Sequence, residues 1–123
     1  MTLAEMFDRL SGNPGISLVD KEGLVEFAAA HSKCLVGFFS DPKAHPENAD
    51  LAVVLPELLR AFPSLRAAVL KPEAVVSAAR DYGVVVYPAL VFLNDGQASK
   101  IMARIQAWAD YHSQIQQWLD GEG

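Results

Sequence analysis

The sequence contains a single cysteine, Cys34, among its 123 residues. One thiol cannot form an intramolecular disulfide, which excludes both a disulfide-stabilised scaffold and a paired Cys-x-x-Cys redox site. No apolar run approaches the roughly 18–20 residues that a membrane-spanning helix needs. The N-terminus also lacks the basic and apolar regions of an export signal. We therefore expect a cytoplasmic protein without membrane insertion.

Motifs for nucleotide, phosphate and metal binding are also missing. No Gly-x-x-x-x-Gly-Lys, Gly-x-Gly-x-x-Gly or Gly-x-Ser-x-Gly pattern occurs. The three histidines, His31, His45 and His112, are far apart, and no cluster has metal-ligand spacing. Acidic residues outnumber basic ones by 15 to 10, which argues against a nucleic-acid partner. We expect no cofactor, no metal and no nucleic acid.

The length and the 51% hydrophobic content indicate one domain with a substantial core. Helical spacing predicts helices over 3–10, 21–31, 51–62, 73–82 and 107–119, and apolar runs predict strands over 16–19, 35–39, 66–70, 89–93 and 97–103. The polar segment 40–50 carries two prolines and is expected to be a loop or a distorted helix start. This alternation predicts a mixed sheet covered on both faces.

Segment 81–97 carries the most specific pattern of the chain. It contains a helix end, a Tyr-Gly turn, a short apolar run, Tyr87-Pro88, an apolar strand and an Asn-Asp-Gly turn. This order resembles thioredoxins, and the resemblance covers nearly the whole chain. It implies a thioredoxin-like three-layer α/β/α sandwich, a single domain over 1–123, with a cis proline at Pro88. In thioredoxins the strand edge beside that proline pairs with the extended backbone of a bound substrate.

The redox site of a thioredoxin is absent from this sequence. A thioredoxin would place Cys-x-x-Cys after the strand 35–39, where this chain has Ser-Asp-Pro-Lys at 40–43. Thioredoxins also bury an acid in that strand, and the matching position here is Gly37. Cys34 precedes the strand, where a buried apolar role is expected. Thiol exchange needs an accessible thiolate and a resolving partner, so we expect no enzyme activity. A thiol–disulfide enzyme that uses Cys34 alone is the alternative.

Four segments carry a narrower resemblance: 40–43, 57–63, 82–88 and 105–108. Together they are similar to the HyaE/HupG/HoxO family, accessory proteins of NiFe-hydrogenase maturation, with similarity expected from about Ser40 to Leu119. The resemblance implies a redox-inactive, non-catalytic chaperone. Such proteins are associated with the precursor of the hydrogenase small subunit, whose twin-arginine signal peptide would be bound before export. A scaffold subunit of a maturation complex, in contact with other hydrogenase accessory proteins, is a further alternative.

Acidic residues gather in and after the loop that replaces the redox site. Carboxylates bind guanidinium groups through bidentate, charge-assisted hydrogen bonds, and a free strand edge can pair with a peptide backbone. An aromatic ring adds an apolar and cation–π face. The candidate partner-binding residues are therefore Asp41, Pro42, Lys43, Glu47, Asp50, Tyr87 and Pro88. The alternative is a solvated acidic loop without a partner.

Overall fold

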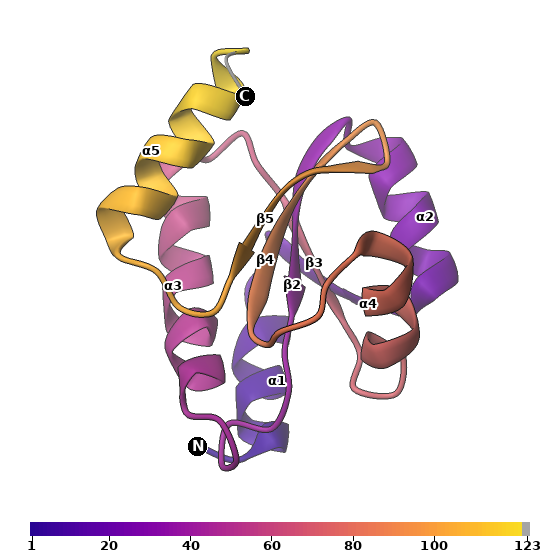
Figure 1. Ribbon diagram of the computed structural model, residues 1–123, viewed down its shortest axis with the longest axis vertical. Coiled ribbons are helices and arrows are strands. Elements are labelled where there is room, and N and C mark those ends of the chain that lie inside the picture. The colour runs from indigo at the N-terminus through magenta and orange to yellow at the C-terminus, as the bar shows by residue number, and fades with distance from the viewer. Residues whose placement is uncertain (122–123) are drawn as a thin grey trace.

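The computed structural model describes residues 1–121, in which five helices alternate with five strands (Figure 1). The elements are α1 (Leu3–Ser11), β1 (Ile16–Val19), α2 (Lys21–Ala30), β2 (Lys33–Phe38), α3 (Glu47–Ala61), β3 (Ala67–Leu70), α4 (Val75–Tyr82), β4 (Ala89–Asn94), β5 (Gln97–Ala103) and α5 (Trp108–Leu119). Every predicted helix and strand is present, and they follow in the predicted order.

The strands form one mixed sheet in the order β1-β3-β2-β4-β5. β1 and β2 are parallel to β3, whereas β4 is antiparallel to both β2 and β5. The parallel strands are joined by the crossover helices α2 and α3, and the antiparallel pair β4–β5 is joined by a tight turn, as these two kinds of pairing require. The sheet therefore closes on a C-terminal hairpin.

Helices cover both faces of the sheet and bury two separate cores. Neighbouring strand residues point to opposite faces, so Leu35 packs with α1, α3 and α5, and Val36 packs with α2 and α4. Figure 1 shows α3 and α5 on one side of the strands and α2 and α4 on the other. The predicted three-layer α/β/α sandwich is confirmed.

Local signals place several element ends where the sequence predicts them. The Asp20 carboxylate accepts a hydrogen bond of 2.7 Å from the Gly23 amide and caps α2. Gly83 ends α4 in the left-handed region with φ 80°. Asp95 and Gly96 have φ 52° and 81°, the conformation of a tight hairpin turn. The Tyr87–Pro88 peptide bond is cis, as predicted.

Two helix starts differ from prediction. α3 begins at Glu47 rather than Leu51, so the end of the expected loop forms the first helical turn. Acidic Glu47 and Asp50 lie in that turn, where carboxylates interact favourably with the helix dipole. α4 begins at Val75 rather than Glu73, because a turn closed by the bond from the Ala74 amide to the Lys71 carbonyl comes first. No helix within 1–121 has the length and apolarity to cross a membrane.

Candidate functional site

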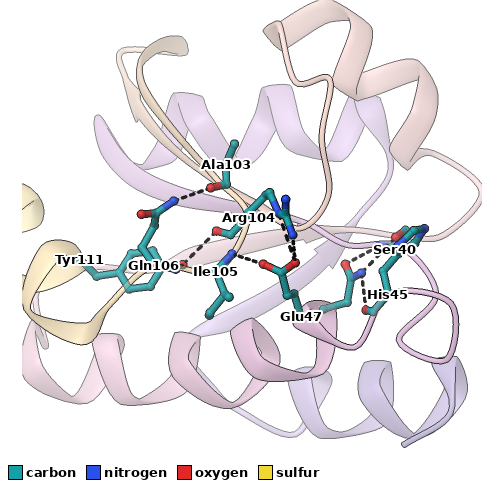
Figure 2. Close-up of polar contacts among 9 residues, drawn as sticks. Ser40, His45, Glu47, Ala103, Arg104, Ile105, Gln106 and Tyr111 are labelled. Atoms are coloured by element: carbon teal, nitrogen blue, oxygen red, sulfur yellow. Dashed lines mark hydrogen bonds and ion pairs between the residues drawn. The ribbon is translucent and has the colours of Figure 1, made fainter.

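A buried asparagine holds the loop that replaces the redox site. Asn48, in the first turn of α3, is fully buried. Its side-chain oxygen accepts a hydrogen bond of 2.8 Å from the Ser40 amide. Its side-chain nitrogen donates to the Ser40 hydroxyl at 3.1 Å and to the His45 carbonyl at 2.9 Å. The two ends of the loop between β2 and α3 are thereby fixed to the helix, as the bonds at Ser40 and His45 in Figure 2 show.

Asn48→Ala is expected to lower the free energy of unfolding by about 1–3 kcal/mol, because it removes the partner of the part-buried Ser40 amide and of the His45 carbonyl. Urea denaturation measures this loss. Asn94→Ala is the matched control, since the Asn94 amide makes only a 3.4 Å contact with Asp95; its expected change is within about 0.5 kcal/mol. Equal losses in the two variants would show that Asn48 does not hold the loop.

Glu47 is bound within the chain. Its Oε2 accepts hydrogen bonds from Nε and Nη2 of Arg104, at 3.2 and 2.5 Å, and its Oε1 accepts one of 3.1 Å from the Ile105 amide. Figure 2 shows this pair joining α3 to the chain after β5. The Arg104 hydrogen bond and then the Ile105 amide lower the pKa of Glu47. The carboxylate is therefore ionised at neutral pH, where the pair holds.

Two hydrogen bonds fix the backbone at Arg104. Arg104 has a positive φ of 62°, its amide donates to the Pro88 carbonyl at 2.7 Å, and its carbonyl accepts from the Tyr111 hydroxyl at 3.3 Å. Burial raises the pKa of Tyr111, which keeps this hydroxyl protonated as a donor. The backbone after the β4–β5 hairpin is thus held in place, and it directs the Arg104 side chain toward Glu47 at the start of α3.

A groove of about 530 Å³ lies between the loop and the segment before Pro88. Its lining residues are Ser40, Asp41, His45, Glu47, Val85, Val86, Tyr87 and Arg104. The structure therefore brings Asp41, Glu47 and Tyr87 together, three of the predicted site residues. Asp41 is exposed, and its Oδ1 accepts a hydrogen bond of 2.9 Å from the Lys43 amide.

The other predicted site residues do not line this groove. Lys43 and Asp50 are exposed but lie outside it. Pro42 and Pro88 are buried, so their rings offer a partner little surface, and their part is to shape the backbone. Because Arg104 neutralises Glu47, the acidic excess in the groove is smaller than the sequence count suggested.

Sequence reasoning missed five groove residues: Ser40, His45, Val85, Val86 and Arg104. The two valines directly precede Tyr87 and are exposed by 88% and 39%. An unbroken apolar run before a cis proline was the available signal. Arg104 had none, since 57 positions separate it from Glu47. Within residues 1–121, the backbone amides and carbonyls of 85–87 make no hydrogen bond to the rest of the chain, so this edge is open to pairing.

The single cysteine of the chain lies away from the surface. Cys34 is fully buried in β2, and burial raises its pKa to about 11. At neutral pH the side chain is a protonated thiol enclosed by the core. Across the described residues, no three His, Cys, Asp or Glu side chains are grouped so as to hold a metal ion.

Comparison with known proteins connects this geometry to a family. The profile described as "Hydrogenase-1 expression protein HyaE" matches residues 6–111. The hydrogenase expression/formation protein HoxO of Azotobacter vinelandii is 33% identical over 117 residues, which cover 95% of this chain and 79% of that protein. HupG of Rhizobium leguminosarum bv. viciae is 35% identical over 109 residues, which cover 85% of this chain and 73% of that protein. The similarity thus extends further toward the N-terminus than expected.

Solved structures agree with both the fold and the family. A thioredoxin of Halobacterium salinarum superposes with a TM-score of 0.73 at 20% identity, over 85% of this chain and 91% of that one, and shows the fold alone. A structure described as hydrogenase expression/formation protein HupG of Rhodopseudomonas palustris has a TM-score of 0.59 at 39% identity, over 85% and 96%. The chain therefore belongs to the HyaE/HupG/HoxO family of hydrogenase expression/formation proteins, and it has their thioredoxin-like fold.

Proposed function

We propose that this hydrogenase expression/formation protein is a non-catalytic cytoplasmic chaperone. It binds the twin-arginine signal peptide of the hydrogenase small-subunit precursor before export. The observation that carries the proposal is the groove itself, whose lining includes the exposed Asp41, Tyr87 and an unpaired stretch of backbone. The buried Cys34 supports binding rather than thiol exchange, because the one thiol of the chain is enclosed in the core.

Each part of the groove matches one property of such a peptide. A twin-arginine signal peptide is an extended segment with two adjacent arginines followed by an apolar stretch. The free amides and carbonyls of 85–87 would pair with its backbone. The Asp41 carboxylate would accept from a guanidinium, and the half-buried Tyr87 ring offers an apolar and cation–π surface.

Asp41 is the main arginine-binding acid in this arrangement. Glu47 already accepts from Arg104 on one oxygen and from Ile105 on the other, so a peptide arginine would have to displace an internal one. Asp50 lies outside the groove. The three acids predicted from the sequence are therefore expected to contribute unequally, with Asp41 first.

Calorimetric titration with the small-subunit signal peptide, and with a version carrying two lysines in place of the arginines, tests the proposal. Lysine keeps the charge but loses the planar fork that binds carboxylate bidentately. We expect the lysine version to bind about tenfold more weakly, equivalent to one lost charge-assisted hydrogen bond. Asp41→Asn should reduce this preference, whereas Asp50→Asn should leave it unchanged.

Three outcomes would contradict the proposal. Equal affinity for the two peptides would reduce the acids to nonspecific attraction. Equal effects of Asp41→Asn and Asp50→Asn would remove the groove from arginine recognition. Binding to the precursor that survives deletion of its signal peptide, without binding to the free peptide, would instead favour the scaffold function.

A further inference from the structure

A second hollow lies on the other side of the segment before Pro88. Its lining residues are Val76, Ala79, Arg80, Gly83, Val84, Val85 and Tyr87. Val85 and Tyr87 line this hollow and the acidic groove alike. The two concavities therefore meet along these side chains, which form a ridge between them. Figure 1 shows this connecting segment running from α4 to the start of β4.

The second hollow is apolar and its exposed surface is made of valines. Val76 is exposed by 61% and Val85 by 88%. Single exposed valines need no explanation, but apolar side chains gathered at the rim of a concavity are typical of an interaction site. Ala79 and Val84 are buried beneath them, so the floor is apolar as well.

Charge differs between the two sides of the ridge. Arg80 is the one charged residue that lines the apolar hollow, and a guanidinium there repels a basic side chain. Asp41, Glu47 and Arg104 line the opposite groove, and because Arg104 pairs with Glu47, the Asp41 carboxylate supplies the net negative charge there. A peptide that crosses Val85 and Tyr87 would therefore contact the acidic groove, which favours a cationic side chain, on one side. On the other side it would contact the apolar hollow, which disfavours a cation.

We infer that the hollow between α4 and Val85 binds the apolar side chains that follow the arginine pair in the same extended peptide. An extended backbone advances about 3.3 Å per residue, so side chains a few positions apart can lie on both sides of the ridge. The charge order then fixes the direction of the peptide, with its arginines in the groove and its apolar stretch against Val76. This inference rests on the proposed function.

A double-mutant cycle tests the inference with two capped synthetic peptides. Both carry an arginine pair; one has leucines at the second and fourth positions after the pair, and the other has serines there. The proteins are the wild type, Val76→Gln and the control Val25→Gln. Val25 is an equally exposed valine, at 64%, on α2, outside both concavities. Glutamine is neutral and a good helix former, so folding and net charge are retained.

Val76→Gln is expected to weaken the leucine peptide about fivefold, which corresponds to part of the burial energy of one leucine. It should leave the serine peptide within about twofold, and Val25→Gln should change neither affinity, since distant sites do not couple. A fivefold coupling between Val76 and the leucines would support the inference.

One result would overturn this inference alone. Both peptides would bind in an arginine-dependent way, and Val76→Gln would bind each of them with the same affinity as Val25→Gln. The acidic groove would then bind arginine while the apolar hollow remains outside the site. Failure of the wild type to bind either peptide would overturn the proposed function and this inference together. The free protein could also prove to be a dimer that Val76→Gln dissociates. The hollow would then bind a second copy of the chain, which would overturn the inference as well.

Discussion

Gly37→Asp, which restores an acid at the position where thioredoxins bury one, is expected to destabilise the fold severely. A Cβ atom on Gly37 would lie 2.6 Å from Cε2 of Phe39 and 3.3 Å from Cγ2 of Val69. Phe39 is 1% exposed and packs in the core with Leu35, so the ring has nowhere to move. The space that the carboxylate would need is filled by this aromatic side chain.

The expected losses follow from this contact. Gly37→Ala should lower the free energy of unfolding by about 1–3 kcal/mol, the usual range for overpacking a core. Gly37→Asp adds an unpaired buried carboxylate, and the loss should exceed about 4 kcal/mol, a large part of the stability of a domain this size. Urea denaturation followed by circular dichroism measures both.

Two further variants make the result specific to Phe39. Gly12→Ala is the matched control, because a Cβ there lies 3.5 Å from its nearest neighbours and φ is −72°; it should be neutral within about 0.5 kcal/mol. Phe39→Leu should lose less stability in the Gly37→Ala background than alone, since the clash is relieved. Equal stability of Gly37→Ala and Gly12→Ala would show that the Phe39 ring moves aside and that position 37 accepts a side chain.

Most of the fold was predictable because its signals are local. The cap at Asp20, the left-handed Gly83 and the turn at Asp95-Gly96 each depend on residues within four positions of one another. The start of α3 was not predictable in this way. Two prolines left a loop and a distorted helix start both open for 40–50, and the buried Asn48 side chain, bonded to Ser40 and His45, fixes the first helical turn at Glu47.

The candidate site was predictable only in part, because it depends on contacts between distant segments. The loop acids and Tyr87 were found from the thioredoxin pattern, and Asp41 and Tyr87 do line the same groove. The Glu47–Arg104 pair could not be found in this way, because it joins the start of α3 to the chain after β5. The exposure of Val85 was also hidden, because an apolar run in sequence predicts burial unless the chain turns outward.

Cys34 is expected to react with a maleimide at pH 8 at least about 100-fold more slowly in the native protein than in urea. Burial raises its pKa from 9.0 to about 11, and a shift of that size lowers the thiolate fraction, the reactive form, on the order of 100-fold. The side chain is also fully enclosed, so reaction requires opening of the core. Stopped-flow or quenched labelling with mass detection measures both rates.

A solvent-accessible thiol in the same protein provides the control. Ser113 lies on the exposed face of α5, so Ser113→Cys in a Cys34→Ala background should label at nearly the same rate with and without urea. Because the folded-state pKa is raised, the Cys34 contribution to stability is present below its ordinary pKa and is lost as the pH rises toward about 11. Native stability should therefore fall over that range in the wild type more than in Cys34→Ala.

The labelling rate decides between the two classes of function. A thiol–disulfide enzyme must present a thiolate to its substrate. Rapid native labelling together with insulin reduction would therefore support the single-cysteine enzyme and contradict the non-catalytic chaperone. Slow native labelling leaves the sulfur without access to any substrate. The groove lined by Asp41 and Tyr87, with its open backbone edge, would then be the candidate surface for the proposed peptide binding.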